Sequence, residues 1–376
     1  MNSAVLSMVE RVIAGSSRTH PADAVLRREL KTRRGVSPVD AADTSRLVFS
    51  YYRWQRWLDK NQPLTAQVLE AKRLAEQFAI RPESFSDADL TAKVLPDWIH
   101  SELRLTPALA KALQTEPQLW LRARPGQGRA VARSLGHCRA AGQGALSDTL
   151  AYRGRQDLFQ SAAFQAGAFE IQDISSQVVG LLCAPQPGQT WWDACAGEGG
   201  KLLHLADLMS NQGLIWATDR SDWRLRRLKR RAARAKVFNY RVASWDGNPK
   251  LPTRTRFDGI LIDAPCTGTG TWQRNPHGRW TLKPHDINEL AEIQLGLLLN
   301  AAPALKSGGK LVYSVCSLTQ SETIGVVEAF NAKASGFSAL AMINPLNEET
   351  DPIETLWFFP QEVRGNGMFV AAWERR

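Results

Sequence analysis

The chain has 376 residues, too many for one small hydrophobic core, which suggests two or three domains. Its apolar fraction of 44% and charged fraction of 22% are typical of a soluble globular protein, and no apolar run approaches the roughly 20 residues that span a bilayer. The net charge of +10 favours a polyanionic partner such as nucleic acid. The N-terminus lacks the basic start and unbroken apolar block of a signal peptide, so we expect a cytoplasmic protein without membrane association.

The five cysteines are widely spaced and odd in number. They are Cys138, Cys183, Cys195, Cys266 and Cys316. Without a CxxC pair, this pattern argues against a disulfide framework and a structural zinc site, so no metal is expected. It favours free thiols in a reducing compartment, and the question is whether any of them is reactive.

The first part of the chain, residues 1–110, is predicted to be a small helical domain. Apolar residues recur three and four positions apart over 21–30 and 43–58, with Arg and Lys between them, and no strand pattern is present. Residues 117–170 then predict a compact α+β segment. Its expected elements are strands near 120–124, 148–153 and 168–172 and a helix over 126–142 that ends at Gly142.

From residue 171 to 376 strand and helix patterns alternate, which predicts an α/β domain. Expected strands cover 190–195, 214–219, 240–246, 257–265 and 310–317, with a closing antiparallel pair at 356–360 and 366–374. Expected helices cover 199–210, 221–236, 286–306 and 321–333. This alternation predicts a mostly parallel sheet with helices on both faces, which binds ligands at the carboxyl ends of its strands.

A glycine-rich loop follows the first of these strands, in the run DACAGEGG (193–200). Gly197, Gly199 and Gly200 would let the backbone turn tightly and approach a ligand closely. The next two strands end in Asp219 and Asp246, and acidic residues at those positions can bind the ribose and base of a nucleoside. S-adenosylmethionine is favoured over NAD, because the glycine spacing is not GxGxxG and no group suits a pyrophosphate.

Two cysteines lie at the ends of later strands, Cys266 in DAPCTGTG (263–270) and Cys316 in YSVCS (313–317). Most free cysteines are simply small buried hydrophobic residues. Two of them at the ligand-binding edge of one sheet, one preceded by Asp-Ala-Pro, indicate chemistry instead.

These motifs, with RNPHGRW (274–280) and FEIQDISSQ (169–177), resemble the RNA cytosine-5 methyltransferase family of the Fmu/Sun and NSun type. The N-terminal runs LRREL and SRLVFSYYRW resemble the NusB-type RNA-binding domain of its bacterial 16S ribosomal RNA member. The resemblance implies a class I (Rossmann-like) methyltransferase domain over 171–376, preceded by an α+β RNA-positioning segment and an all-helical NusB-like domain.

The resemblance also implies catalytic roles for four residues. Cys316 would add to carbon 6 of cytosine, which makes carbon 5 nucleophilic. Cys266 would help to remove the carbon 5 proton or release the enzyme, while Asp263 would bind the ring at N3 and Lys201 would contact the flipped base. The expected cofactor-binding residues are Cys195, Ala196, Gly197, Glu198, Gly199, Gly200, Lys201, Asp219, Asp246 and Asp263.

Four residues, at three places in the chain, depart from the family pattern. Gly197-Glu198 stands where the family has Ala-Pro, which alters the loop and adds a negative charge beside the cofactor. His277 stands where Asp is frequent, and Arg124 stands where an RxN motif has Asn, so a different contact is expected there. None of these changes removes a proposed catalytic group.

We expect RNA to be positioned mainly by residues 117–170 and then by the helical domain. The helix at 221–236 carries eight Lys or Arg, and we interpret it as a solvated face that packs Trp223, Leu225 and Leu228 inward. Contact of its basic side chains with RNA phosphates is the alternative.

Ribosomal RNA of the small subunit is the favoured substrate, and transfer RNA is an alternative. Methylation of an exocyclic nitrogen is a second alternative, disfavoured because that chemistry needs no cysteine. A noncatalytic RNA-binding ribosome-assembly factor is a third, and a monomer is expected in each case.

Overall fold

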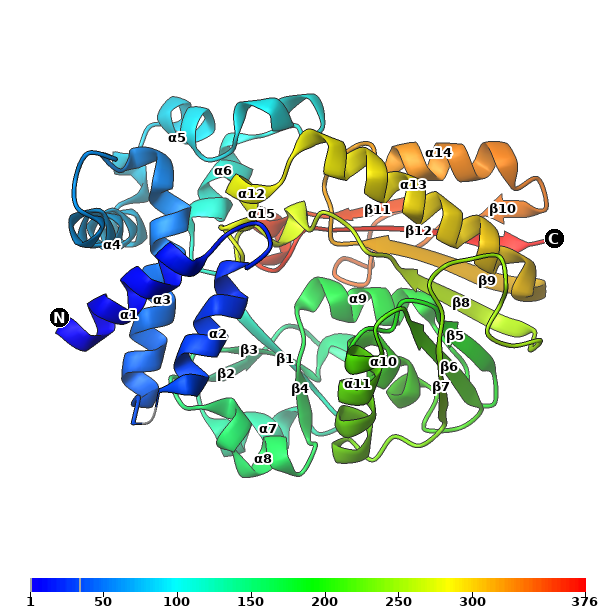
Figure 1. Ribbon diagram of the computed structural model, residues 1–376. Helices are drawn as coiled ribbons and strands as arrows, with labels where there is room; N and C mark the ends of the chain where they lie inside the picture. Colours follow the sequence, from blue (N-terminus) through cyan, green and yellow to red (C-terminus); the bar gives the residue numbers. More distant parts are fainter. Residues whose placement is uncertain (1, 34) are drawn as a thin grey trace.

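The computed structural model describes residues 2–33 and 35–376, which form three neighbouring parts (Figure 1). The first part is helical and comprises α1 (Ser3–Gly15), α2 (Ala22–Thr32), α3 (Pro38–Trp54), α4 (Leu64–Ile80), α5 (Asp87–Lys93) and α6 (Pro107–Gln114). Local sequence explains where α3 begins: the Ser37 side chain accepts a hydrogen bond from the Asp40 amide, and Pro38 is the first helical residue. Val48 and Trp54 on its inner face are fully buried.

The second part is a four-stranded antiparallel sheet in the order β2-β3-β1-β4. It contains β1 (Leu119–Ala123), β2 (Cys138–Ala140), β3 (Thr149–Tyr152) and β4 (Phe169–Ile171), with helices α7 (Gly128–Leu135) and α8 (Ala162–Gln165). The predicted helix over 126–142 is therefore wrong in its second half. Gly136 and His137 have φ values of +63° and +49°, which turn the chain out of the helix, and the next residues pair with β3 as an edge strand.

The third part is a large mixed sheet. Its strands are β5 (Thr190–Asp193), β6 (Leu214–Asp219), β7 (Tyr240–Ser244), β8 (Phe257–Asp263), β9 (Leu305–Val315), β10 (Phe337–Ala339), β11 (Thr355–Phe358) and β12 (Met368–Arg375). Its helices are α9 (Ile174–Cys183), α10 (Gly200–Leu208), α11 (Asp222–Arg234), α12 (Gly278–Thr281), α13 (Pro284–Ala301), α14 (Ile324–Lys333) and α15 (Pro360–Val363). The helix expected over 286–306 ends earlier, at Ala301, because Leu305 already begins β9 by pairing with Phe257 of β8.

The order of this sheet is β10-β12-β9-β8-β5-β6-β7, with β11 paired to β12. Strands β5 to β9 are parallel, as predicted, and β12 runs antiparallel to β9. From β5 the chain moves outward to β6 and β7, then returns to β8 on the other side of β5. The connections after β5 and β8 therefore diverge, which opens a ligand-binding crevice at the carboxyl ends of these two strands.

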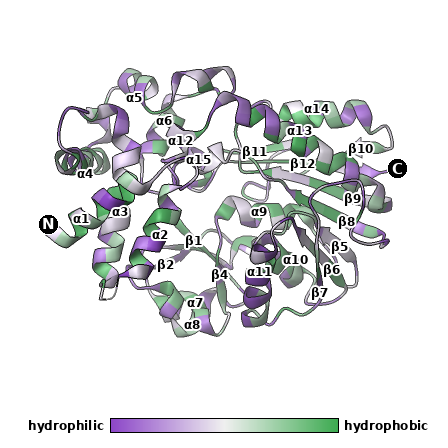
Figure 2. Ribbon diagram, in the orientation of Figure 1, coloured by the Kyte–Doolittle hydropathy of each residue, from purple (hydrophilic) through white to green (hydrophobic). Residues whose placement is uncertain are grey.

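Helices cover both faces of the large sheet (Figure 1). Trp191 and Trp192 are neighbours in β5 and point to opposite faces: the first packs with α9, α10 and α11, and the second with α13 and α14. The central strands are hydrophobic, whereas α11 is strongly hydrophilic on its outer side (Figure 2). Within the described ranges, no helix combines the length and apolar character needed to cross a membrane.

The helical part shares its hydrophobic core with the large α/β part. Trp272, Ile287 and Leu318 belong to the same buried cluster as α1, α3 and α4. In addition, the Trp280 indole donates a 2.7 Å hydrogen bond to the carbonyl of Tyr52. The helices therefore pack directly against the segment 272–287, which follows the Cys266 loop.

Candidate active site

The loop after β5 forms one wall of a cavity of about 490 Å³ at the carboxyl edge of the sheet. Its lining from this loop consists of Cys195, Ala196, Gly197, Glu198 and Gly200. Gly197 and Gly199 have φ values of +55° and +85°, which L side chains rarely adopt. Gly199 faces away from the cavity, where an added Cβ would lie 2.8 Å from the Leu228 side chain. The glycines therefore allow both the turn and the close packing of the loop on α11.

The unusual Gly197-Glu198 dipeptide is held in place by α11 and by Asp219. The Gly197 amide donates to an Asp219 oxygen at 3.0 Å, and the Glu198 carboxylate pairs with Arg227 at 3.1 Å. Arg231 donates to the Glu198 carbonyl at 3.1 Å. The charge of Glu198 is thus balanced by an arginine, and the loop keeps an open shape without the Ala-Pro of the resembled family.

Only one of the two carboxylates expected after β6 and β7 reaches this loop. Asp219 is buried behind it and accepts hydrogen bonds from the amides of Gly197 and Ser221. Asp246 is exposed, binds Asn248 in its own loop, and does not line the cavity. Of the expected cofactor-binding residues, Gly199, Asp219 and Asp246 therefore do not line the cavity, although Asp219 supports the loop from behind through the Gly197 amide.

Asp193, which sequence reasoning did not select, lines the cavity at the end of β5. It is 1% exposed, and neither carboxylate oxygen has a hydrogen-bond partner in the part of the chain that the structure describes. Burial, and next the charge of Asp263, raise the pKa of Asp193 to about 7. A buried carboxylate that lines a cavity and has no side-chain donor is placed to bind a ligand that carries a donor or a positive charge. In the sequence, the only signal for a role of Asp193 was its position directly before the glycine-rich loop, and that signal is weak.

The two cysteines at strand ends lie side by side. The Cys266 sulfur, in the loop after β8, is 3.3 Å from the Cys316 sulfur at the end of β9. The hydrogen bond from Cys266 lowers the pKa of Cys316, and the same bond, with burial, raises the pKa of Cys266 well above its usual value. Because the thiolate is the nucleophile, this asymmetry favours Cys316 for attack and leaves Cys266 protonated.

Cys195 also lines the cavity, but its thiol is not activated. Burial and the nearby carboxylates, Asp193 first among them, raise the pKa of Cys195 well above its usual value. Cys195 therefore contributes packing beside the cavity rather than a nucleophile.

Buried Lys201 and half-buried Asp263 form an ion pair near the Cys316 thiol. Lys201, in the first turn of α10, donates to Asp263 at 2.7 Å, and the Ser314 hydroxyl donates to the other Asp263 oxygen at 2.9 Å. Burial alone would lower the pKa of Lys201, but Asp263 outweighs it and the pKa is raised, so the ammonium stays charged. The structure thus brings three of the four expected catalytic side chains, Lys201, Asp263 and Cys316, to the lining of one cavity. Cys266 does not line it and reaches it only through its contact with Cys316.

A further carboxylate, missed by sequence reasoning, anchors the two cysteine segments. Glu322 is fully buried and accepts hydrogen bonds from the Thr267 amide at 2.8 Å and from the hydroxyls of Ser317 and Thr319 at 2.6 and 2.9 Å. Gln294 of α13 donates to it at 3.0 Å. Thr267 follows one cysteine and Ser317 the other, so Glu322 is a positioning residue for both thiols.

In the RNPHGRW segment (274–280), the first residue lines the cavity, whereas later residues contact the helical part. Arg274 is exposed and lines the cavity. His277 packs edge-on against Tyr52 at 4.6 Å, and fully buried Arg279 donates to Gln114 at 2.9 Å. The departure at His277 therefore falls at a contact with α3 and not at the cavity.

Two other sequence interpretations change in the structure. Arg122 and Arg124 both form ion pairs with Asp207 of α10. Arg124, which stands where the family has Asn, therefore links the small sheet to a helix of the large α/β part. The expectation that Trp223 packs inward is wrong, because it is 50% exposed while Leu225 and Leu228 are buried. Trp223 precedes Leu225 by two residues, which is a rotation of about 200° around the helix axis. The Trp223 side chain therefore points away from the buried side of α11.

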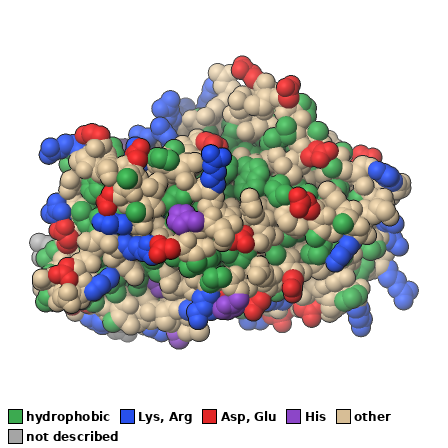
Figure 3. Space-filling view, turned by 90° about the horizontal axis from the view of Figure 1, so that it is seen from above, with side chains coloured by type: hydrophobic (Ala, Val, Ile, Leu, Met, Phe, Trp, Pro, Cys, Tyr) green, Lys and Arg blue, Asp and Glu red, His purple; other side chains and the backbone are tan. Residues whose placement is uncertain are grey.

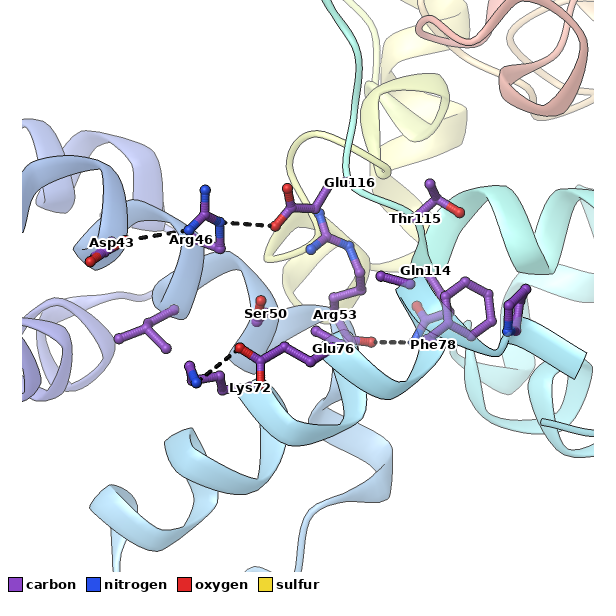
Figure 4. Close-up of a pocket in the computed structure, with 14 residues that line it drawn as sticks. Asp43, Arg46, Ser50, Arg53, Lys72, Glu76, Phe78, Gln114, Thr115 and Glu116 are labelled. Carbon is purple, nitrogen blue, oxygen red and sulfur yellow. Dashed lines mark hydrogen bonds and ion pairs between the residues drawn. The ribbon is translucent and has the colours of Figure 1, made fainter. Parts of the chain in front are cut away.

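Another cavity, of about 620 Å³, lies among α3, α4 and α6 (Figure 4). Arg46 pairs with Asp43 and Glu116 at 3.3 Å each, and Lys72 pairs with Glu76 at 2.9 Å. Its rim charges are thus already balanced, and its described lining contains no cysteine. The cavity at the sheet edge remains the candidate active site.

The large sheet, parallel from β5 to β9 and with antiparallel β12 next to β9, has the class I methyltransferase fold. The protein PH0851 shares the fold with a TM-score of 0.80 and 22% identity, covering 99% of this chain and 98% of that one. NSun6 from Pyrococcus horikoshii, solved with SFG, is 30% identical, with a TM-score of 0.52, and the match covers 58% of this chain and 56% of that one.

The family model of the 16S rRNA methyltransferase RsmB/F matches residues 180–374, and the chain belongs to this family. The probable ribosomal RNA small subunit methyltransferase B of Synechocystis sp. is 36% identical over 221 residues, which are 56% of this chain and 49% of that protein. The chain thus spans about half the length of the curated relatives it matches. The family resemblance of the sequence motifs is confirmed.

Proposed function

We propose that the chain is an S-adenosylmethionine-dependent RNA (cytosine-5)-methyltransferase that acts on small-subunit ribosomal RNA. The observation that supports this most directly is the pair of sulfurs 3.3 Å apart, one of which, that of Cys316, lines the same cavity as Lys201 and Asp263. Methylation of an exocyclic nitrogen has no use for two adjacent thiols of opposite pKa shift. The names of the relatives in the RsmB/F family favour small-subunit ribosomal RNA as the substrate.

The residues of the cavity suit the cofactor. Unpaired Asp193 can bind a positively charged group, and the loop at Gly197 leaves the backbone accessible. NSun6, 30% identical, was solved with SFG, an analogue of S-adenosylmethionine. When bound, S-adenosylmethionine supplies a methyl group on a positively charged sulfur.

The side chains of this site then divide the work on the base. The Cys316 thiolate adds to carbon 6 of a cytosine held out of its stack, and carbon 5 becomes nucleophilic. Asp263, fixed by Lys201 and Ser314, faces N3, where protonation favours that addition. After carbon 5 gains its methyl group, its proton passes to water, the electron pair of that carbon–hydrogen bond restores the double bond between carbons 5 and 6, and the bond between carbon 6 and the Cys316 sulfur breaks. The protonated Cys266 thiol, 3.3 Å from the Cys316 sulfur, donates a hydrogen bond to the departing thiolate.

The test is nucleoside analysis of RNA after the reaction. The wild-type chain is incubated with S-adenosylmethionine carrying a labelled methyl group and unmodified 16S ribosomal RNA, which is then digested and analysed by mass spectrometry. We expect label in 5-methylcytidine. Label in another nucleoside would contradict the proposed chemistry, and no transfer, despite cofactor binding by calorimetry, would favour a noncatalytic RNA-binding factor.

Cofactor affinity should rise with pH between about 6 and 8. Without ligand, Asp193 has a pKa of about 7, and a cationic ligand favours its carboxylate form, so binding below that pH must release a proton. Affinity is expected to fall up to about tenfold for each pH unit below 7 and to level off above 8. Calorimetry in buffers of different ionisation enthalpy measures both affinity and proton release. Asp193→Asn should remove the pH dependence, and retention of it would exclude Asp193 as the titrating group.

A further inference from the structure

A second hollow, of about 670 Å³, adjoins the candidate active site and is bounded by all three parts of the chain. We call it the arginine groove after the arginines in its lining, which are Arg27, Arg227, Arg230, Arg231, Arg234 and Arg274. Arg27 comes from α2, four others come from α11, and Arg274 comes from the segment after the Cys266 loop. Arg231 and Arg274 also line the active-site cavity, so the two hollows lie next to each other.

The groove has more positive charge than its own carboxylates balance. Glu170 at its floor is paired with Arg231 at 2.8 Å and with Arg234, and Glu198 is paired with Arg227. Arg230 and Arg274 are exposed, and the described ranges provide no carboxylate within ion-pair distance of either. On the face seen in Figure 3, by contrast, Lys and Arg are interspersed with Asp and Glu. The arginine groove therefore fits an anion such as a phosphodiester.

An exposed aromatic ring stands at the edge of the groove. Phe159 is 56% exposed and contacts Phe164 edge-on at 5.0 Å. The Arg234 guanidinium lies 3.6 Å from the centre of the Phe164 ring, so that ring is already covered on one side. Phe159 thus offers a ring for stacking next to uncompensated arginines, and this combination is typical of single-stranded nucleic acid sites.

We propose that the arginine groove binds the RNA nucleotide adjacent to the target cytosine, with its base stacked on Phe159 and the connecting phosphates held by Arg230 and Arg274. This rests on the proposed function and adds to it the route by which the strand leaves the active site. Arg274 lines both hollows, so it lies where the backbone would pass from the target base to its neighbour.

Binding of a short, fluorescein-labelled, single-stranded RNA with one central cytosine tests this, by anisotropy at several salt concentrations. Phe159→Ala should weaken binding about fivefold or more with an unchanged salt slope, and Phe159→Trp should keep wild-type affinity. Arg230→Ala should weaken binding and reduce the slope of log Kd against log salt by about one. Matched controls are Phe238→Ala and Lys229→Ala, both exposed and outside the groove, which should bind within about twofold of wild type.

Wild-type affinity in both Phe159→Ala and Arg230→Ala, or no binding by the wild-type chain, would overturn the groove proposal. If the wild-type chain methylates RNA while these variants bind unchanged, the groove proposal fails and the proposed function stands. If the variants weaken binding as expected but no methyl transfer occurs, the proposed function fails and the groove remains an RNA site.

Discussion

Cys266→Ala is expected to accumulate a covalent complex with RNA in the presence of S-adenosylmethionine, visible as a slower band on a denaturing gel. In the structure the Cys266 thiol is the neighbour of Cys316 at 3.3 Å, and its removal leaves the attack of Cys316 possible while impairing release. Because the Cys266 hydrogen bond lowers the pKa of Cys316, the variant should form the complex faster as the pH is raised above neutral.

Replacement of Cys316 instead of Cys266 distinguishes the roles of the two thiols. Cys316→Ala should form no covalent complex and should lose methyl transfer by on the order of a thousandfold or more, since it removes the nucleophile. Cys138→Ala is the matched control, because this thiol lies in β2 of the small sheet, and it should behave as wild type. A complex in Cys316→Ala, or none in Cys266→Ala while the wild-type chain methylates the RNA, would show that the roles are assigned wrongly.

Arg279→Met is expected to lower the free energy of unfolding by about 3 kcal/mol or more. Arg279 is fully buried and donates hydrogen bonds to Gln114 at 2.9 Å, to the carbonyl of Trp272 at 3.0 Å and to that of Leu113. Methionine retains most of the apolar volume but leaves these acceptors buried without donors. Among the described residues no carboxylate lies within ion-pair distance of Arg279, so hydrogen bonds hold this side chain. Burial, and next the charge of Arg53, lower the pKa of Arg279 well below its usual value.

Urea unfolding followed by tryptophan fluorescence measures this change. Arg226→Met is the matched control, because Arg226 is exposed on α11 and should change the unfolding free energy by less than about 0.5 kcal/mol. A loss below about 1 kcal/mol in Arg279→Met would show that the helical part and the segment 272–280 do not depend on this side chain. The same variant should also weaken catalysis, because that segment carries Arg274.

Several features could be predicted from local sequence because local chemistry controls them. Alternating strand and helix patterns require a parallel sheet, and such a sheet brings all its strand ends to one edge. The positions of Cys266 and Cys316 at strand ends therefore predicted their meeting, although they are 50 residues apart. Gly197 and Gly199 predicted a tight loop for the same local reason, since only glycine adopts those φ values without strain.

Other features depend on contacts between distant segments, which composition and periodicity do not encode. Asp193 and Glu322 are both buried carboxylates, but no described side chain donates a hydrogen bond to Asp193, whereas several groups donate to Glu322. This difference depends on how β5, the Cys266 loop and α13 pack together. Asp219 is the last residue of β6, but β7 ends at Ser244, so Asp246 lies in the following loop and is exposed to solvent. The arginine groove arises because folding places α2, α8 and α11 around one hollow, so its excess of charge is a property of packing and not of any single segment.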